Sequence, residues 1–512
     1  MHEFFTRRLF MLLWFCVGLY ACQVFNPAER PLYIDNQIYF FMSERVASGV
    51  PPHVSLVDHK NALSTIITGA GIAAMRPFGV DDVIAAKIVS VIFTAGTVVA
   101  VWLLAWRLSG SWIAAHMSAL LMLVFVDYFA QGAQGVRPKV FMAFFVAASL
   151  AAQARDRLWR TGALGACAFL CWQPALLIPA CLAVTSAIRA PHLARFARVA
   201  GGAVAAFVLY EAYFLWHGAL GEQLFQNYVM STREEAWPVP EFLSSLDFIV
   251  RMGSWRLDRS RVITTIFLIV ASAAPLVALR YRRATQELFE SQPAWAGLAL
   301  STYATLAFTF VNHQAYPDMF FVYPSIATVT GLSIGLLFRK LERPTAVAVL
   351  RWGVLAVCAT AIFHLAWERR TLFTARNTGL ASQRLLADQV DTFRDHHGSI
   401  WAIGCPHLLA MNRQDNFVKF SLVIDPNIRA YIASLTGGAP YMPLDDARKP
   451  PGVILTSRGN ERKVIPWLPR FYYEHVNAAF KKQGIRVWFR RKNIRIPPTY
   501  FTPPQVVPAK DA

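Results

Sequence analysis

The segment that organises the chain starts with Tyr33-Ile34-Asp35-Asn36-Gln37 and ends with Val57-Asp58-His59-Lys60. It follows the first hydrophobic stretch. It gathers carboxylates, a histidine and a lysine in a chain that is otherwise rich in long apolar runs. A polar loop of this kind, placed between two hydrophobic stretches, lies at a membrane surface. We therefore expect the chemistry of the protein in this loop.

The composition is that of a polytopic membrane protein. Of the 512 residues, 55% are hydrophobic and only 16% are charged, and apolar runs long enough to cross a bilayer recur along the chain. Much of the formal net charge of +19 lies in short loops, where Lys and Arg set the topology and meet anionic headgroups. The charge therefore does not predict nucleic-acid binding. The seven cysteines show neither a disulfide framework nor the spacing of a zinc site.

The first membrane helix is predicted over Leu9–Phe25, with Arg7-Arg8 on the cytoplasmic side. We interpret it as an uncleaved helix rather than a signal peptide, because many further spans follow. An outside loop, residues 26–61, comes next and contains a short amphipathic helix at the interface, Ile38 to Gly49. The apolar run Ala62–Met75 is interpreted as re-entrant or interfacial, because only then do all strongly basic loops fall inside.

The other apolar runs complete a prediction of about eleven transmembrane helices, with the N-terminus cytoplasmic and the C-terminus outside. Two of these runs are short and are interrupted by Pro174, so a half-helix hairpin is the alternative for that pair. The runs after the first are Val83–Trp106, Ser111–Phe129, Lys139–Gln153, Thr161–Cys171, Gln173–Ile188, Val199–Trp216, Val262–Leu279, Ala294–Val311, Met319–Phe338 and Thr345–Ala366.

The domain prediction follows from where the apolar runs stop. Residues 1–366 form a membrane domain with outside loops at 26–61 and 217–261, residues 367–495 form a small soluble α/β domain, and residues 496–512 form a loose tail. No internal repeat is visible. In the soluble domain, helices are predicted at Leu380–His397 and Arg470–Lys482, and strands at Ile400–Gly404, Val418–Ile424, Gly452–Thr456 and Arg486–Phe489.

Asp35 has two interpretations. It precedes a predicted helix, so it suits the N-cap position, where its carboxylate would accept hydrogen bonds from the first free N–H groups. It is also an acid on the outer face, where a general base for an acceptor hydroxyl would stand. The spacing by itself favours the cap.

Basic side chains in two outside loops suggest a phosphate site. In Asp58-His59-Lys60, Lys60 is either a point charge for phosphate or part of a solvated interfacial cluster. Arg137 either binds phosphate or extends to lipid headgroups. A third polar turn, Asn312–Asp318, includes His313 and Tyr316. No carboxylate cluster is dense enough to identify a divalent cation, so the cofactor is left unknown.

Four motifs in this order resemble a known superfamily. Asp35 follows the first helix and precedes a helix ending at Gly49. His59-Lys60-Asn61-Ala62-Leu63 is similar to a His-Lys-Pro-Pro-Leu motif, with both prolines replaced. Arg137-Pro138 is similar to an Arg-Pro-acid motif, with Lys139 in the place of the acid, and Tyr316-Pro317-Asp318-Met319 resembles Tyr-Pro-His-Tyr. The membrane half thus resembles the GT-C glycosyltransferases, above all the protein mannosyltransferase and lipid A aminoarabinose transferase group.

The resemblance implies a GT-C-like fold in a bacterial inner membrane and sugar transfer from a polyprenyl-phosphate carrier. The acceptor would be a hydroxyl on a glycan, lipid or protein at the periplasmic face. Carried over, Asp35 is the catalytic base of an inverting displacement, and Lys60 and Arg137 compensate the charge of the leaving phosphate. Asp58, His59, His313 and Tyr316 complete the predicted substrate-binding residues.

Two other functions stay open. A transporter or flippase for a lipid-linked substrate would also place polar groups in the membrane, although such proteins more often show internal repeats. The third interpretation is an inactive relative that binds the lipid without turnover. The absence of a repeat and the gathering of the candidate residues on one face favour the enzyme.

Overall fold

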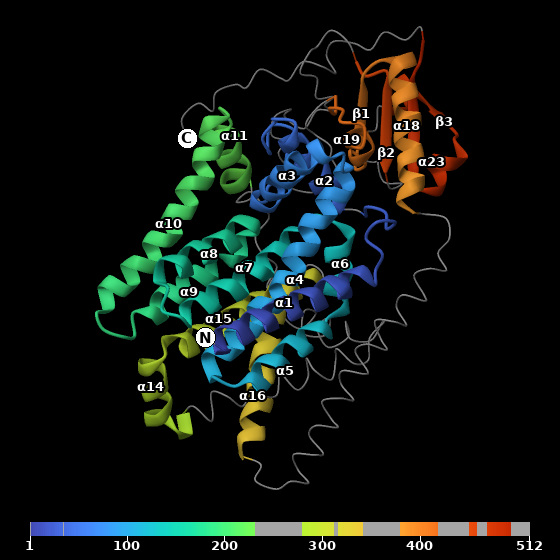
Figure 1. Ribbon diagram of the computed structural model, residues 1–512. Helices are drawn as coiled ribbons and strands as arrows, with labels where there is room; N and C mark the ends of the chain where they lie inside the picture. The colour runs from blue at the N-terminus through green and yellow to red at the C-terminus, as the bar shows by residue number, and fades with distance from the viewer. Residues whose placement is uncertain are drawn as a thin grey trace, which may run out of the picture.

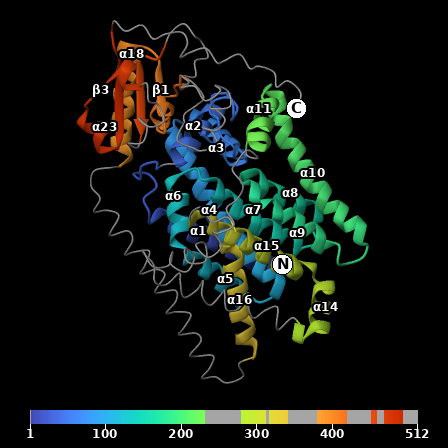
Figure 2. The same cartoon turned by 180° about the vertical axis from the view of Figure 1, so that it is seen from behind.

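A bundle of apolar helices and a small α/β unit at one end of it make up the computed structural model of the chain (Figures 1 and 2). The structure describes residues 2–33, 35–230, 279–311, 316–340, 379–417, 450–457 and 468–492. Several predicted segments lie outside these residues: most of the loop 217–261, the spans at 262–278 and 345–366, the strand at 418–424 and the tail 496–512.

Three helices in the described parts are long and apolar enough to cross a membrane by themselves. These are α1 (His2–Gln23), α4 (Asp82–Ser109) and α10 (His192–Trp216). Helix α4 has 28 residues, well above the roughly 20 that a bilayer requires. It packs against α1 on one side and α7 on another, so it forms the centre of the bundle. The chain is thus a helical membrane protein, and α1 begins earlier than the predicted Leu9.

The predicted span Ser111–Phe129 is broken into two helices that together are long and apolar enough to cross a membrane. The structure has α5 (Trp112–Leu123) and α6 (Val126–Gln134), which meet at an angle of 63°. Between them Phe125 leaves the helical region (φ −80°, ψ 70°), and its ring stacks on Tyr323 at 4.0 Å between centroids. Tertiary packing of this aromatic ring therefore overrides the local preference for one helix.

The remaining helices before the α/β unit are mostly short. The predicted break at Pro174 is present: α8 (Leu158–Cys171) ends before η2 (Gln173–Leu176), and α9 (Leu177–Ser186) follows. A Cβ at Gly165 would lie 3.2 Å from Pro179, so α8 and α9 approach closely. The others are α7 (Pro138–Gln153), α11 (Leu220–Leu224), the π-helix η3 (Phe225–Met230), α14 (Arg282–Ser291), α15 (Pro293–Val311), η5 (Tyr316–Phe321) and α16 (Tyr323–Lys340).

Helix α2 (Asp35–Ala47) forms where the sequence predicted a short helix, but it is not amphipathic as predicted, because it is buried on nearly every face. Helix α3 (Leu63–Met75), followed by η1 (Arg76–Phe78), covers one side of it. A Cβ at Gly69 would lie only 2.5 Å from the Val46 side chain, so the two helices meet at this glycine. The polar positions of α2 are buried in ion pairs: Glu44 with Arg76 at 2.8 Å, and Arg45 with a residue of the α/β unit, Asp415, at 2.8 Å.

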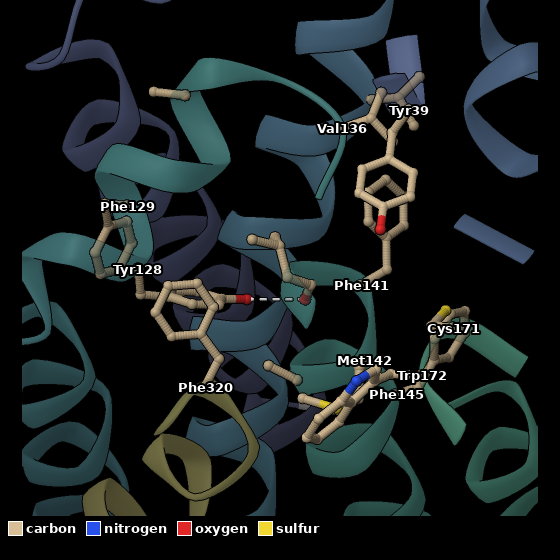
Figure 3. Close-up of a cluster of buried hydrophobic side chains, with 14 of the residues drawn as sticks. Tyr39, Tyr128, Phe129, Val136, Phe141, Met142, Phe145, Cys171, Trp172 and Phe320 are labelled. Carbon is tan, nitrogen blue, oxygen red and sulfur yellow. Dashed lines mark hydrogen bonds between the residues drawn. The ribbon is translucent and has the colours of Figure 1, made fainter. Parts of the chain in front are cut away.

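Aromatic side chains fill the core below α2. Figure 3 shows Tyr39 of α2 together with side chains of α6, α7 and η5. The Tyr128 hydroxyl donates to the Val140 carbonyl at 3.2 Å, and its ring meets Phe320 edge-on at 5.2 Å. Since η5 lies far along the chain from α6, this aromatic core joins the late helices to the early ones.

The α/β unit contains a four-stranded sheet of order β1-β2-β4-β3. Strand β1 (Ile400–Ile403) runs parallel to β2 (Val453–Ser457), and β4 (Ile485–Arg490) pairs antiparallel with both β2 and β3 (Tyr472–His475). Its helices are α18 (Leu380–His397), α19 (His407–Ala410), α22 (Leu468–Phe471) and α23 (Ala478–Lys482). A small C-terminal α/β unit is therefore present, as predicted.

The predicted helix Arg470–Lys482 is wrong in its first half, where β3 stands instead. Tyr472 is buried and donates a hydrogen bond to the Pro451 carbonyl at 2.8 Å, whereas Tyr473 is exposed. This alternation is that of a strand, and the pairing with β4 stabilises it. The helix begins only at α23, where Asn477 caps the first turn through Ala479 N–H.

His407 of α19 should make the α/β unit sensitive to acid. It is buried, neither of its ring nitrogens is hydrogen-bonded to a described residue, and this burial lowers the pKa of His407 to about 3. The unfolded chain takes up this proton below about pH 6.5, so stability is complete above that pH and falls below it. We expect the free energy of unfolding to fall by about 2 kcal/mol from pH 6.5 to 5.

The measurement is the thermal unfolding of the full chain in detergent at both pH values. His407→Leu should remove this part of the pH dependence, whereas replacing the exposed His396 with Gln should leave it intact. An equal loss of stability in the His407→Leu protein would contradict the assignment to His407.

Candidate functional site

The loop that precedes Asp35 is fastened to the α/β unit. The Leu32 N–H donates to Gln383 Oε1, and Gln383 Nε2 donates to the Leu32 carbonyl, both at 2.9 Å. A third hydrogen bond runs from the Leu380 N–H to the Glu29 carbonyl, at 2.8 Å. Helix α18 therefore holds the main chain three residues before Asp35.

A buried lysine of α4 holds the same loop from the membrane side. Lys87 is 1% exposed, and its ammonium donates to the carbonyl of Pro27 at 2.7 Å and to that of Arg30. These carbonyls are the partners that a buried ammonium needs. The loop is thus fixed from both sides, and Asp35 follows it as the first residue of α2.

Arg137 lies against Asp35. Its Nη2 atom is 3.1 Å from Asp35 Oδ2, and its Nη1 atom is 3.5 Å from Asn36 Oδ1. Pro138 opens α7 and keeps Arg137 extended. Gly135, at φ 121° and ψ −151°, has a backbone that only glycine adopts readily, and its carbonyl accepts from Ser90 Oγ at 2.8 Å. The backbone conformation around Arg137 therefore directs its side chain toward the start of α2.

Lys60 lies near the same place, beside the hydroxyl of Tyr39. The Tyr39 oxygen raises the pKa of Lys60 more than burial lowers it, and the carboxylates of Asp58 and Asp35 act in the same direction as Tyr39. The lysine therefore stays cationic. Tyr39 stands one helical turn after Asp35, so both lie on one face of α2.

The loop that carries Lys60 is held by hydrogen bonds in place of prolines. Asn61 Nδ2 donates to the Phe169 carbonyl at 3.0 Å, and Asn227 Nδ2 donates to Asn61 Oδ1 at 2.9 Å. The Ala62 N–H donates to the hydroxyl oxygen of Tyr210 at 2.9 Å. The two expected prolines are thus replaced by a loop that a backbone carbonyl of α8 and side chains of α10 and η3 hold in place.

Asp58 and His59 belong to this scaffold. Asp58 is 4% exposed, and its N–H donates to Gln226 Oε1 at 3.1 Å. His59 Nδ1 lies 3.8 Å from Asp58 Oδ1, and the His59 carbonyl accepts from Gln173 Nε2 at 2.6 Å. Both residues lie next to Lys60 in the chain and brace its loop.

The two positions that depart from the Arg-Pro-acid and Tyr-Pro-His-Tyr patterns contact each other. Lys139, directly after Arg137-Pro138, forms a buried ion pair with Asp318 of η5. Its ammonium also lies 4.5 Å from the centre of the Trp172 ring. The pair ties η5 to the start of α7. Tyr316 begins η5, and nothing is described of its side chain; His313 lies outside the described residues.

The structure therefore brings Asp35, Arg137 and Lys60 together at the start of α2. Sequence reasoning missed Tyr39, Lys87 and Gln383. The spacing of four residues from Asp35 gave a usable signal for Tyr39, but no local pattern links Gln383 to Leu32. Among the described residues no group of three or more His, Cys, Asp or Glu side chains is gathered as a metal site.

Asn61→Ala should destabilise the protein by about 1–3 kcal/mol, because it leaves the Phe169 carbonyl and the Asn227 amide buried without these partners. Thermal unfolding in detergent measures the effect. Ser64→Ala is the matched control, since the Ser64 hydroxyl is buried and makes no hydrogen bond to any residue that the structure describes. That variant should unfold at the same temperature as wild type or higher. Equal unfolding temperatures for Asn61→Ala and wild type would show that the loop does not depend on Asn61.

Solved structures are the only comparison that finds relatives: no protein-family model matches the chain, and no curated protein matches it. The chain is similar to ArnT from Cupriavidus metallidurans bound to undecaprenyl phosphate, with a TM-score of 0.62 and 13% identity over 95% of this chain and 99% of that one. The apo state of that ArnT gives a TM-score of 0.58 and 15% identity over 94% of this chain and 97% of that one.

An archaeal protein shares the fold as well. The Archaeoglobus fulgidus oligosaccharyltransferase, in complex with Zn and sulfate, is similar with a TM-score of 0.51 and 11% identity, over 93% of this chain and 73% of that one. Identities this low establish the fold alone. The chain therefore has the fold of the GT-C membrane glycosyltransferases, as the resemblance in its sequence predicted.

Proposed function

We propose that the protein transfers a sugar from a polyprenyl-phosphate carrier to an acceptor hydroxyl at the outer membrane surface. The observation that carries the proposal is the contact of Asp35 with Arg137, next to Lys60. One carboxylate that is 38% exposed thus stands beside two cations. A fold relative bound to undecaprenyl phosphate supports the class of donor.

In the proposed reaction Asp35 takes the proton of the acceptor hydroxyl. The acceptor oxygen forms a bond to the anomeric carbon, and the bond from that carbon to the phosphate oxygen breaks. The electron pair leaves with the polyprenyl phosphate, and a single displacement inverts the anomeric centre. Base catalysis of this kind contributes roughly 10²–10⁴ in rate.

Arg137 and Lys60 are proposed to stabilise the leaving phosphate. The guanidinium of Arg137 has five N–H donors, so it can keep its contact with Asp35 and still bind phosphate oxygens. Lys60 supplies a point charge that the contact with Tyr39 keeps protonated. The phosphate dianion formed in the reaction is therefore met by charges that are already in place.

The orientation is proposed from the distribution of basic residues. Helix α4 runs from Asp82, which pairs with Arg413 of the α/β unit, to Arg107 at the other end. Arg155 and Arg157 lie near that other end, in the turn between α7 and α8. By the positive-inside rule this end faces the cytoplasm and the α/β unit lies outside.

The test is donor consumption by protein reconstituted in vesicles, with a panel of undecaprenyl-phosphate sugars and an envelope extract as the source of acceptors. Release of undecaprenyl phosphate is followed together with sugar incorporation. We expect one donor to be consumed and its sugar to appear on an acceptor with inverted configuration. Binding of undecaprenyl phosphate without consumption of any donor would favour the binding-only function, to which the Lys139–Asp318 departure from the family pattern also points.

A further inference from the structure

A cavity lies at the end of the bundle opposite Asp35. Its volume is about 540 Å³, and helices α1, α4, α7 and α8 line it. They contribute the middle of α1, the second half of α4, residues 144–152 of α7 and the first half of α8. Apolar side chains form most of its wall: Met11, Leu12, Phe15, Val99, Leu103, Phe144 and Leu164.

Four arginines line one end of this cavity, and we call them the arginine rim: Arg107, Arg155, Arg157 and Arg160. Among the residues that the structure describes, no carboxylate forms an ion pair with any of the four. The nearby Asp156 pairs with Arg195 instead, at 2.9 Å from its Nη1 atom. The rim therefore carries several positive charges that no described carboxylate neutralises.

Arg107 is the deepest member of the rim. Its Nη1 atom donates to the Ala151 carbonyl, while its Nε atom is buried and makes no hydrogen bond within the described parts of the chain. At the surface, burial and the charges of Arg7 and Arg157 lower the pKa of Arg155. The guanidinium groups thus repel one another, and an anion bound among them would relieve this repulsion.

We propose that this cavity binds an anionic phospholipid, with the headgroup phosphate at the arginine rim and an acyl chain along the apolar wall. A cavity with a cationic rim and an apolar wall matches a molecule that has an anionic headgroup and an apolar chain. A free phosphate or a nucleotide would leave the wall unfilled. The volume lies in the range of ordinary ligand sites. The site stands apart from Asp35 and does not depend on the proposed sugar transfer.

The experiment titrates delipidated full-length protein in detergent with dioleoyl phosphatidylglycerol, and follows bound lipid by native mass spectrometry. Phosphatidylcholine and inorganic phosphate are the comparison ligands. The first variant is Arg155→Gln/Arg157→Gln/Arg160→Gln, which changes three exposed side chains and should fold. The second is Ala148→Trp, which fills the cavity and leaves the rim intact. Arg189→Gln is the matched control, an exposed arginine that does not line the cavity.

We expect wild type to bind phosphatidylglycerol more tightly than phosphatidylcholine. The triple variant should bind phosphatidylglycerol about a hundredfold more weakly, at the usual contribution of each cation near a lipid headgroup. Ala148→Trp should weaken the binding of both lipids, and Arg189→Gln should change the affinity for neither. Equal affinity of the triple variant and wild type would overturn the proposal. The proposal would also be overturned if inorganic phosphate bound in the cavity and displaced phosphatidylglycerol completely.

Discussion

Asp35→Asn should slow sugar transfer by a factor of about 10²–10⁴ while binding of undecaprenyl phosphate persists. The amide is nearly the same size as the carboxylate, and its oxygen can still accept a hydrogen bond from Arg137. It cannot take the proton of an acceptor hydroxyl at neutral pH. Arg137 and Lys60 remain in place, so the phosphate keeps its cationic partners. Single-turnover measurements of donor consumption, beside a binding measurement with undecaprenyl phosphate, separate the two effects.

Glu29→Gln is the matched control for this prediction. Glu29 is an exposed carboxylate in the same loop, and it accepts a hydrogen bond from the Asn26 side chain at 2.6 Å. Its replacement should leave turnover near the wild-type value. Equal turnover for Asp35→Asn and wild type would remove the base from the mechanism. Asp35 would then be an acidic residue that stabilises the first turn of α2, together with its ion pair to Arg137.

Breaking the ion pair between Lys139 and Asp318 should cost about 3–5 kcal/mol of stability. Asp318 is 1% exposed, so Lys139→Met leaves a carboxylate buried without this cation. Asp318→Asn leaves the ammonium of Lys139 without its carboxylate, although the Trp172 ring stays close to it. Chemical unfolding of both single variants in detergent measures the loss.

The double variant Lys139→Met/Asp318→Asn tests the pairing itself. Because neither charge is then left alone, its loss of stability should be smaller than the sum of the two single losses. Glu474→Gln is the control, since Glu474 and Arg486 form a partly exposed pair at 3.7 Å that should contribute at most about 1 kcal/mol. Additive losses in the double variant would show that the two residues act independently.

The sequence predicted the general architecture because hydrophobic length and periodicity are local signals. The long apolar run in α4 and the break at Pro174 were both visible in this way. The bend at Phe125 was not, because it depends on a ring in α16. Strand β3 was not predicted either, because pairing with β4 decides it. Helix and strand boundaries that depend on residues distant in the sequence cannot be predicted from local patterns.

The candidate site was predicted in the same uneven way. Asp35, Lys60 and Arg137 stand in recognisable motifs, and the structure brings them together. The structural roles of the residues that depart from those motifs could not be predicted from the sequence. Asn61 replaces a rigid ring with hydrogen bonds, and Lys139 is matched by a second change 179 residues later. Only contacts in space show that each departure is compensated.

The bidentate bond of Gln383 to Leu32 also bears on the order in which the protein is made. The two residues are 351 positions apart, so the loop before Asp35 is synthesised long before the residue that clamps it. Domains generally form in the order in which they leave the ribosome. The helices of the bundle therefore enter the membrane with this loop unfastened, and the site reaches its final geometry only after residue 383 has followed.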